Sequence, residues 1–499
     1  MTARFDAPTL AGAVIALLGA AWYALLASGA VWAPETSYFG ESLYDAYWAS
    51  VRDGRLDVPP RLAYFEGHYA QDGRAYLYHG AAPLLTRGLF GWATGYGDGT
   101  LAKLTVFFGA ALGTVLYHAA IQSFFLRMET VPRRWTVIGA GLIGVGLWFG
   151  GPGVLLATNT SFYHEPIAIA FLMGGLFVFV LSRVLASGLS PLLAVVPLAA
   201  AAALTLHARP NLAVGLYLGV LILLARNGLT DRFRAVPTGA AALVLLAASG
   251  LGYMTLNSQK FGSPDAAHGE FSAEAPVVYG EVFWGMEHPK SARAEAFAEH
   301  GRFNPARIAP NAVLYLLAMP TGQQAPTIGD ALVERFHAVT GPRLGYIRVE
   351  HPWVGIAFLW PAWLLLAVFA ARGEPKALAR EMLLGAGLLT AALLTLSYGT
   401  VALRYRIDLW PLIAFAAMLG LPNFVRAVRP GEGRAGASPL LVLVAVGGLA
   451  LGGAAVSMKT ARAYALSFGI APELSKDTCL QAYRTKGFDE PSAEAFCSL

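Results

Sequence analysis

The feature that most constrains this chain is a series of apolar runs, each close to the length of a membrane span. A helix that crosses the hydrocarbon core of a bilayer needs about 20 mostly apolar residues. Eleven runs approach this length, at roughly 8–33, 101–126, 136–156, 166–186, 190–206, 211–226, 235–256, 352–371, 381–400, 407–424 and 438–457. Hydrophobic residues make up 56% of the 499 residues and charged residues only 13%, which excludes a disordered chain, a nucleic-acid-binding protein and an ordinary cytosolic enzyme. The sequence therefore predicts an all-α polytopic membrane protein.

Two apolar stretches need separate interpretation. The run at 8–33 is too long for a signal peptide, and no clear small-residue cleavage site follows it, so we interpret it as a retained span. The stretch 83–96 is apolar but too short to cross a bilayer, which favours an interfacial or re-entrant segment. Residues 1–457 are then one transmembrane domain, and 458–499 form a tail.

Basic residues give the spans an orientation. The short loops on one side hold Arg4, Arg127, Arg133, Arg134, Arg183, Arg226, Arg232, Arg234, Arg372, Lys376, Arg380, Arg426, Arg429 and Arg434. By the positive-inside rule these loops and the N-terminus are cytoplasmic. The long segments 34–100 and 257–351 and the tail 458–499 are then outside. Arginine far outnumbers lysine, which favours a bacterial chain and hence the inner membrane.

The two cysteines of the chain both fall in the predicted outer tail. An outer location exposes Cys479 and Cys497 to an oxidising compartment, where thiols can pair. We predict a disulfide between them, because the chain has no other cysteine. The alternative is two unpaired thiols in a mobile tail.

Polar and aromatic residues cluster near the outer ends of the predicted spans. In the first outer segment, Glu41 and Asp45 are four residues apart and lie on one face of a helix. Tyrosine and tryptophan side chains surround these acids at Tyr38, Tyr44, Tyr47 and Trp48. The Asp72–Gly73 pair predicts a hairpin turn between aromatic-rich arms. Later loops add Tyr163, His164, Glu165, Arg209, Arg404 and Arg406 at the same membrane boundary.

These residues can be read in two ways. Ionisable residues at a membrane edge are functional candidates, and two arginines there can grip a phosphate. Tyrosine, tryptophan and arginine also gather at headgroup level simply as anchors. His164 and Glu165 are adjacent, so they are a weak metal pair, and Glu165 before Pro166 also suits a helix start. No metal-ligand set is convincing, although scattered acids could bind a divalent cation, and no cofactor is expected.

The motifs resemble those of a known enzyme class. GESLYDAYWASVRDGRL, DGRAYLYHGAAPLL, NTSFYHEPIAI, NSQKFGSP and ALRYRIDLWPL occur in the order seen in GT-C polytopic glycosyltransferases. The chain is similar in layout to the bacterial relatives of the dolichyl-phosphate-mannose protein mannosyltransferases and of the aminoarabinose transferases. There is one departure: where that class has Asp-Glu, this chain has Gly40–Glu41.

The resemblance implies an inverting sugar transfer from a polyprenyl-phosphate donor to a glycan, lipid or protein acceptor. A carboxylate base, Glu41 with Asp45 as alternate, would deprotonate the acceptor. Arg404, Arg406 and Arg209 would hold the leaving phosphate, and the boundary residues Tyr44, Asp72, Tyr163, His164 and Glu165 would contact substrate. Two other classes stay open: a non-catalytic partner in envelope glycan assembly, which the Gly40 departure leaves open, and a transporter or flippase, which would carry charges near the bilayer midplane.

Overall fold

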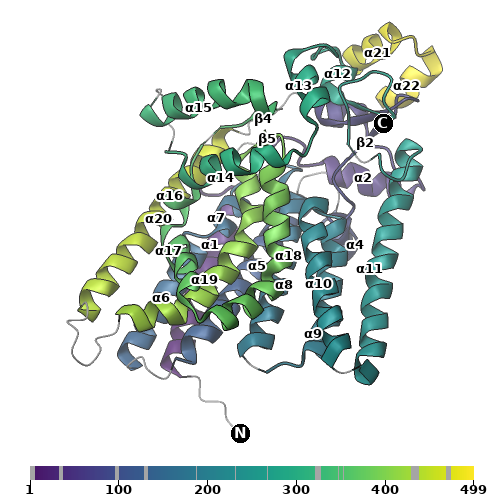
Figure 1. Ribbon diagram of the computed structural model, residues 1–499. Helices are drawn as coiled ribbons and strands as arrows, with labels where there is room; N and C mark the ends of the chain where they lie inside the picture. Colours follow the sequence, from purple (N-terminus) through teal and green to yellow (C-terminus); the bar gives the residue numbers. More distant parts are fainter. Residues whose placement is uncertain are drawn as a thin grey trace.

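The computed structural model describes residues 6–32, 38–95, 100–128, 133–186, 188–230, 232–266, 268–320, 327–346, 348–351, 353–428, 438–467 and 474–498. Arg4, Arg429 and Arg434 of the predicted cytoplasmic loops lie outside these ranges. Figure 1 shows a bundle of long helices with shorter helices and strands gathered at one end. We refer to that end, formed mainly by 38–95, 262–355 and 474–498, as the loop-rich end.

The long helices confirm the predicted membrane class. Within the described residues, nine helical segments are long and apolar enough to cross a bilayer. They belong to α1 (Ala7–Ala27), α5 (Thr100–Leu126), α6 (Arg133–Trp148) with α7 (Pro152–Ala157), α8 (His164–Ala186), α10 (Pro210–Thr230), α11 (Arg232–Phe261), α18 (Pro375–Ser397), α19 (Arg406–Val428) and α20 (Pro439–Ser467). The other two predicted spans are shorter apolar helices.

The two remaining predicted spans form shorter helices for different reasons. α9 (Pro191–Leu206) begins after the cap residue Ser190, whose hydroxyl accepts the Leu192 amide, and ends at His207. The predicted span 352–371 is divided between α16 (Ile356–Leu359) and α17 (Pro361–Phe369). Proline has no amide hydrogen and its ring excludes the preceding helical turn, so the helix cannot run through Trp360–Pro361.

Small residues allow the long helices to approach closely. A methyl group on Gly215 of α10 would meet the Gly387 carbonyl of α18, and one on Gly387 would meet the Gly215 carbonyl. Gly109 of α5 likewise faces the backbone of Ala168 in α8. Such contacts are the usual basis of helix association in lipid, where burial of apolar surface gives little gain. By contrast, α11 stands at the edge of the bundle in Figure 1.

The first long segment forms one part of the loop-rich end. It contains α2 (Leu43–Arg52), α3 (Pro60–Ala63), β1 (His68–Ala70), β2 (Ala75–Tyr76) and α4 (Leu84–Thr94), which covers the stretch predicted as interfacial. β1 and β2 form the predicted hairpin, with Gly73 at φ 84° in its turn. β3 (Val277–Tyr279) joins the other edge of β1, so the second long segment adds an antiparallel strand to the first.

The second long segment continues as short elements beside that sheet. These are α12 (Gly280–Phe283), α13 (Ala292–His300), α14 (Ile308–Leu317), α15 (Ile328–Leu344) and β4 (Arg348–Val349). β4 pairs in parallel with β5 (Thr400–Val401), which lies just before α19. The pairing brings residues about 50 positions apart to the same edge of the loop-rich end.

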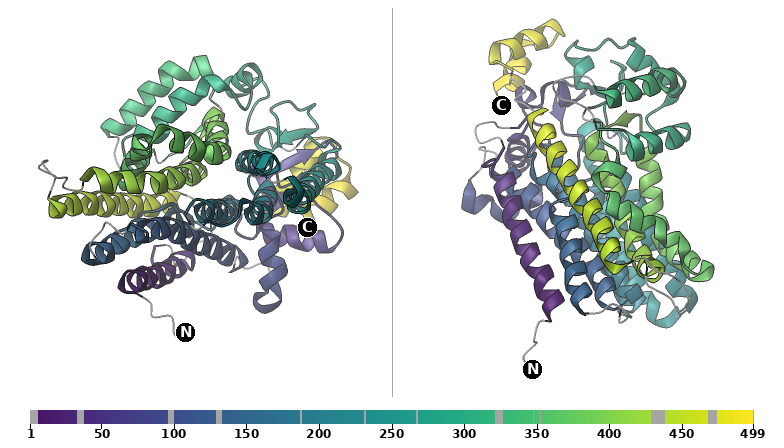
Figure 2. Two further views of the ribbon diagram at one scale, coloured as in Figure 1. Left: turned by 60° about the horizontal axis from the view of Figure 1, so that its bottom comes forward. Right: turned by 90° about the vertical axis from the view of Figure 1, so that its left-hand side faces the viewer.

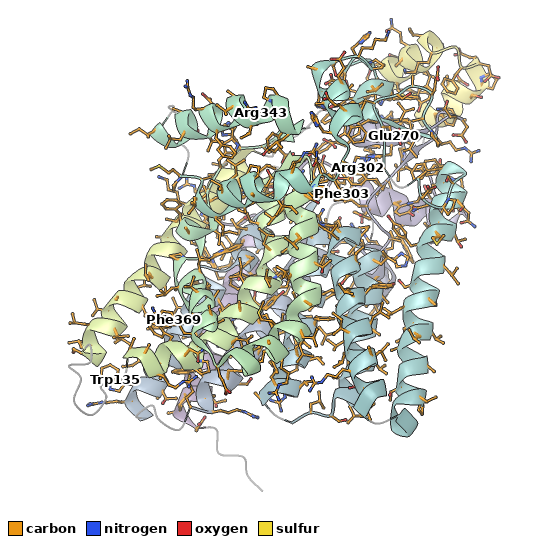
Figure 3. All side chains as sticks on the ribbon, viewed as in Figure 1. Trp135, Glu270, Arg302, Phe303, Arg343 and Phe369 are labelled. Atoms are coloured by element: carbon orange, nitrogen blue, oxygen red, sulfur yellow. A yellow bond between two sulfur atoms is a disulfide. The ribbon has the colours of Figure 1, made fainter. Side chains whose placement is uncertain are left out.

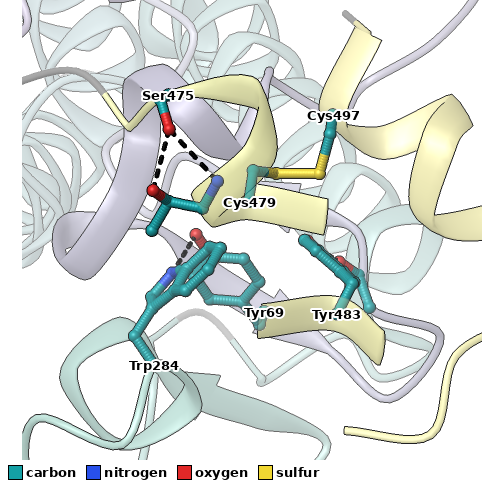
Figure 4. Close-up of a disulfide and its surroundings, with 8 residues drawn as sticks. Tyr69, Trp284, Ser475, Cys479, Tyr483 and Cys497 are labelled. Carbon is teal, nitrogen blue, oxygen red and sulfur yellow. Dashed lines mark hydrogen bonds between the residues drawn. A yellow bond between two sulfur atoms is a disulfide. The ribbon is translucent and has the colours of Figure 1, made fainter. Parts of the chain in front are cut away.

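A disulfide confirms the predicted pairing of the two cysteines. Cys479 of α21 (Lys476–Thr485) is bonded to Cys497 of α22 (Glu490–Ser498). This C-terminal hairpin lies at the end of the molecule opposite the start of α1 (Figure 2). The Tyr483 hydroxyl donates to the Gly73 carbonyl at 2.7 Å, and its ring packs near Trp284 (Figure 4). Trp284 in turn donates to the hydroxyl of Tyr69 in β1 at 2.7 Å. These contacts hold the C-terminal helical hairpin against the three-stranded sheet.

Candidate functional site

Among the described residues, three adjacent hollows lie where the long helices meet the loop-rich end. The central hollow is narrow, about 40 Å³, and its wall includes Glu66, Tyr163, Tyr279, Glu350 and Arg404. The helix-side hollow, about 240 Å³, reaches between α10, α11 and α18. The outward hollow, about 510 Å³, opens among residues 263–303. His268 and Arg302 line all three, which places them at the junction.

Arg404 occupies one wall of the central hollow. It lies in the short helical turn Leu403–Tyr405 between β5 and α19. Glu350, which follows β4, grips the guanidinium at two points, with Nη2 3.1 Å from Oε1. The Arg404 guanidinium also lies over the ring of Tyr163, 4.6 Å from its centroid. Pairing of β4 with β5 therefore brings together both members of this ion pair.

Arg209 holds a similar position in the helix-side hollow. It directly precedes α10 and forms a buried ion pair with Asp408 of α19. Asn211 donates to Thr395 Oγ1 at 3.2 Å and to the Asp408 carboxylate at 3.4 Å. Tyr405 connects the two arginines, since its ring lies 4.9 Å from the Arg209 guanidinium and 5.1 Å from that of Arg404.

Arg302 differs from the other arginines around these hollows. One of its terminal nitrogens donates to the Gly269 carbonyl at 3.2 Å, and its guanidinium lies 5.6 Å from the Phe297 ring. In the part of the chain that the structure describes, no carboxylate is within ion-pair distance of it. Figure 3 shows Arg302 beside Phe303, where the bundle meets the loop-rich end.

Imidazole and phenol rings fill the space next to Arg302. The ring centroid of His268 lies 4.5 Å from that of His68 and 4.5 Å from that of Tyr78. Burial, together with the positive charge of Arg302, lowers the pKa of His68 to about 3. The same two causes hold the pKa of His268 well below its ordinary value. Both imidazoles are therefore neutral at pH 7, and the positive charge here resides on arginine.

Three residues predicted from sequence form a separate buried cluster with Arg87. Asp45 of α2 accepts from Arg87 Nε at 2.9 Å, and Glu165 of α8 accepts from Arg87 Nη2 at 3.2 Å. Tyr44 lies alongside and donates to the Gly80 carbonyl at 3.2 Å. None of these four side chains lines the three hollows. The cluster fixes α4 against α2 and α8.

Glu41 also lies outside the three hollows. It is buried and accepts a hydrogen bond from the Thr160 hydroxyl. Burial is the main reason that the pKa of Glu41 is raised. The preceding Gly40 has φ 67°, and a side chain added there would meet the Phe162 ring. The local backbone therefore favours glycine where the resembling class has aspartate.

The remaining predicted residues are spread more widely. Arg406 packs over Tyr315 at 4.9 Å and donates to the Ala402 carbonyl, so it faces α14 instead of Arg404. His164 is buried, with Nδ1 2.9 Å from the Ser161 hydroxyl. Asp72 lies on the hairpin turn with its side chain about half exposed. Of the predicted residues, Arg404, Arg209 and Tyr163 are the ones brought to the hollows.

Several lining residues carried no signal in the sequence. Glu66, His268, Arg302 and Glu350 lie in the two long segments, where neither periodicity nor a motif set them apart. Tyr64, two residues before Glu66, has φ 37°, which is uncommon for a residue with a side chain. Among the described residues, no group of three or more His, Cys, Asp or Glu side chains is placed to hold a metal ion.

Comparison with known proteins gives only distant structural likeness. No protein-family profile matches the chain, and no curated protein sequence matches it. Its structure is similar to the apo oligosaccharyltransferase of Archaeoglobus fulgidus, with a TM-score of 0.47 and 12% identity over 97% of this chain. It is also similar to AglB from that organism in complex with an inhibitory peptide and a dolichol-phosphate, with a TM-score of 0.44 and 14% identity over 97% of this chain. The chain spans 59% of the length of those two structures.

Proposed function

We propose that this protein is a GT-C-type glycosyltransferase that moves a sugar from a polyprenyl-phosphate donor to an acceptor at the outer face of the bacterial inner membrane. The observation that carries the proposal is the set of three adjacent hollows, whose walls share His268 and Arg302. One hollow reaches into the helix bundle, another opens away from it, and arginines line both the former and the junction. An amphiphile with an apolar tail, a phosphate and a sugar fits these hollows, taken in order from the helix bundle outward.

Charge sorting supports an outer location for this site. The helix ends and short connections at the opposite end of the bundle carry Arg127, Arg183, Arg226, Arg372 and Arg426. The positive-inside rule makes that end cytoplasmic and gives a cytoplasmic N-terminus and an outer C-terminal hairpin. A disulfide in the hairpin suits an oxidising compartment.

The reaction needs a base and a cationic partner for the leaving group. The acceptor oxygen forms a bond to C1 of the sugar, and the bond from C1 to the phosphate oxygen breaks with its electron pair on the phosphate. A carboxylate takes the acceptor proton. Arginines at the hollows stabilise the negative charge of the released polyprenyl phosphate.

Two carboxylates of the first long segment are candidates for the base. Glu41 occupies the position that the resemblance favours, whereas Glu66 lines the central hollow. Asp45 is a weaker candidate because Arg87 already binds its carboxylate. We assign the base role to Glu66 on position and keep Glu41 as the alternative.

Transfer by purified protein tests the proposal. Wild-type protein in nanodiscs is supplied with a panel of undecaprenyl-phosphate-linked hexoses and pentoses, and release of undecaprenyl phosphate is measured with and without candidate acceptors. We expect release from at least one donor and loss of release in an Arg404→Gln variant. Movement of donor between leaflets without cleavage of the sugar–phosphate bond would instead identify a flippase. Donor binding without cleavage in any condition would favour a non-catalytic partner.

A further inference from the structure

The arginines around the site differ in how their charge is balanced. Arg404 is held by Glu350, and Arg209 by Asp408. Arg293, also on the wall of the central hollow, is held by Glu281. A carboxylate already occupies the binding edge of each of these guanidinium groups, so an incoming anion would have to displace it. Leaving that carboxylate buried without its partner is costly.

Arg302 has no such competitor among the described residues. Within the described residues, its one hydrogen bond is to the neutral Gly269 carbonyl at 3.2 Å, and it uses a single N–H group. A guanidinium has five N–H donors, so donors remain for a second ligand. The carbonyl and the nearby Phe297 ring hold the side chain without neutralising it.

The position of Arg302 is as specific as its charge. It lines the helix-side, central and outward hollows alike. A phosphate at this point is reached by a lipid tail from the helix side and by a sugar from the outward side. Four acids of the described residues face the same space: Glu66 and Glu350 in the central hollow, and Asp265 and Glu270 in the outward hollow. Glu350 is already paired with Arg404, and none of the four is within ion-pair distance of Arg302.

We propose that Arg302 is the residue that binds the phosphate of the polyprenyl-phosphate donor. The inference rests on the proposed function and assigns one contact within it. Arg404 and Arg209, held by their carboxylates, shape the walls of the site and contribute to its positive field. The shared chemistry is a phosphate oxyanion, whether attached to a lipid or free.

Binding of radiolabelled undecaprenyl phosphate to full-length protein in nanodiscs tests the assignment. Arg302→Gln removes the charge, Arg302→Lys keeps the charge but loses the planar fork, and Arg335→Gln removes one charge from the exposed face of α15. We expect Arg302→Gln to weaken binding by roughly 10- to 100-fold, the range for a charge-assisted contact. Arg302→Lys should be intermediate, and Arg335→Gln should stay within about twofold of wild type.

Undecaprenol and inorganic phosphate are parallel probes. Affinity for undecaprenol should be the same in all variants, because it lacks the phosphate. Arg302→Gln with the wild-type affinity for undecaprenyl phosphate overturns the assignment. If Arg302→Gln does not give a monodisperse protein, Arg302→Met replaces it as the neutral variant, and wild-type affinity in Arg302→Met also overturns the assignment.

The two proposals fail in different ways. Wild-type protein that binds undecaprenol and undecaprenyl phosphate equally well contradicts the proposed function. Calorimetric titration with inorganic phosphate then still tests Arg302: binding that Arg302→Gln abolishes identifies a free-phosphate site, whereas no binding by the wild type overturns the assignment. Transfer activity that survives in Arg302→Gln with full donor affinity contradicts the assignment alone.

Discussion

Arg404 and Glu350 form a two-point ion pair that joins the residue after β4 to the turn before α19. Both side chains are largely removed from solvent, with 6% and 18% of their surfaces exposed. The pair lies on the wall of the central hollow and connects the second long segment to the helix bundle.

Glu350→Gln should therefore lower stability and change anion binding together. Loss of one partner leaves a mostly buried guanidinium with a neutral acceptor, at a cost of about 1–3 kcal/mol. Thermal unfolding in detergent should show a lower Tm, while affinity for undecaprenyl phosphate should rise because Arg404 becomes available. An Arg404→Gln/Glu350→Gln double variant is the control and should bind the lipid no better than wild type. An unchanged Tm in Glu350→Gln would show that the ion pair contributes little.

Glu66→Gln should separate binding from chemistry. Loss of a general base commonly reduces rates by about 10²- to 10⁴-fold, so sugar transfer should fall by at least about 100-fold. Donor affinity should not fall, because Glu66→Gln removes only a negative charge from the wall of the hollow that Arg302 also lines. Glu41→Gln should keep most of the activity, since Glu41 is buried and lies outside the three hollows. The reverse pattern, with activity lost only in Glu41→Gln, would place the base at Glu41.

Arg87→Met should prevent accumulation of folded protein. The substitution leaves Asp45 and Glu165 as neighbouring buried carboxylates, and breaking a buried pair costs about 3–5 kcal/mol. The yield of monodisperse protein by size-exclusion chromatography is the measurement, with Arg335→Met as the matched surface control. Adding Asp45→Asn and Glu165→Gln to Arg87→Met should recover part of the yield, because no buried charge remains. Normal yield of the single variant would argue against a structural role for this cluster.

Gly40→Asp should destabilise the first long segment, although it recreates the Asp-Glu pair of the resembling class. Gly40 combines φ 67° with contact to Phe162, so the new side chain is both strained and crowded. Gly54→Asp isolates the strain, since Gly54 has φ 75° with nothing within 4 Å of the added atom. We expect Tm to fall further in Gly40→Asp, with about 1–3 kcal/mol for strain common to both. Equal Tm values in Gly40→Asp and Gly54→Asp would show that crowding by Phe162 does not contribute to the destabilisation.

Removal of the disulfide should loosen the sheet as well as the hairpin. The bond closes a loop with a sequence separation of 18, for which chain entropy predicts about 3 kcal/mol. In a Cys479→Ala/Cys497→Ala variant, hydrogen exchange should speed up in α21 and α22 and, through Tyr483 and Gly73, in β1 and β2. Tyr483→Phe keeps the disulfide and removes only the contact to Gly73, so it should affect β1 and β2 more than α22. Unchanged exchange in the sheet of both variants would disconnect it from the hairpin.

The spans and the disulfide were the most predictable parts of this structure. A 20-residue apolar run is a strong signal because no other local arrangement satisfies the backbone in lipid. The predicted span 352–371 is the exception, because it is divided at Trp360–Pro361. Apolar composition alone does not show that a proline interrupts the helix. Cys479 and Cys497 could be paired because topology placed both on one side and no third cysteine competed.

The site was harder to predict because its contacts join distant loops. The sequence singles out Arg404 by its position on the predicted outer side, yet Glu350, its partner, lies in a segment without periodicity. Arg404 and Arg406 are two residues apart, and the turn between β5 and α19 directs them to different neighbours, Tyr163 and Tyr315. Arg302 stands out only when the other arginines are seen to have carboxylate partners, and pairing of that kind has no sequence signature.

The hydrogen bond from Tyr483 to Gly73 spans 410 positions of sequence. Membrane helices are inserted as the chain is synthesised, so every span from α5 to α20 has to be threaded before this contact can form. The hairpin that carries Tyr483 also holds the disulfide between Cys479 and Cys497, which has to form by oxidation. Completion of the loop-rich end is thus a late event in biogenesis. A ribosome stalled before α21 would leave a fully inserted helix bundle whose sheet lacks the hydrogen bond from Tyr483.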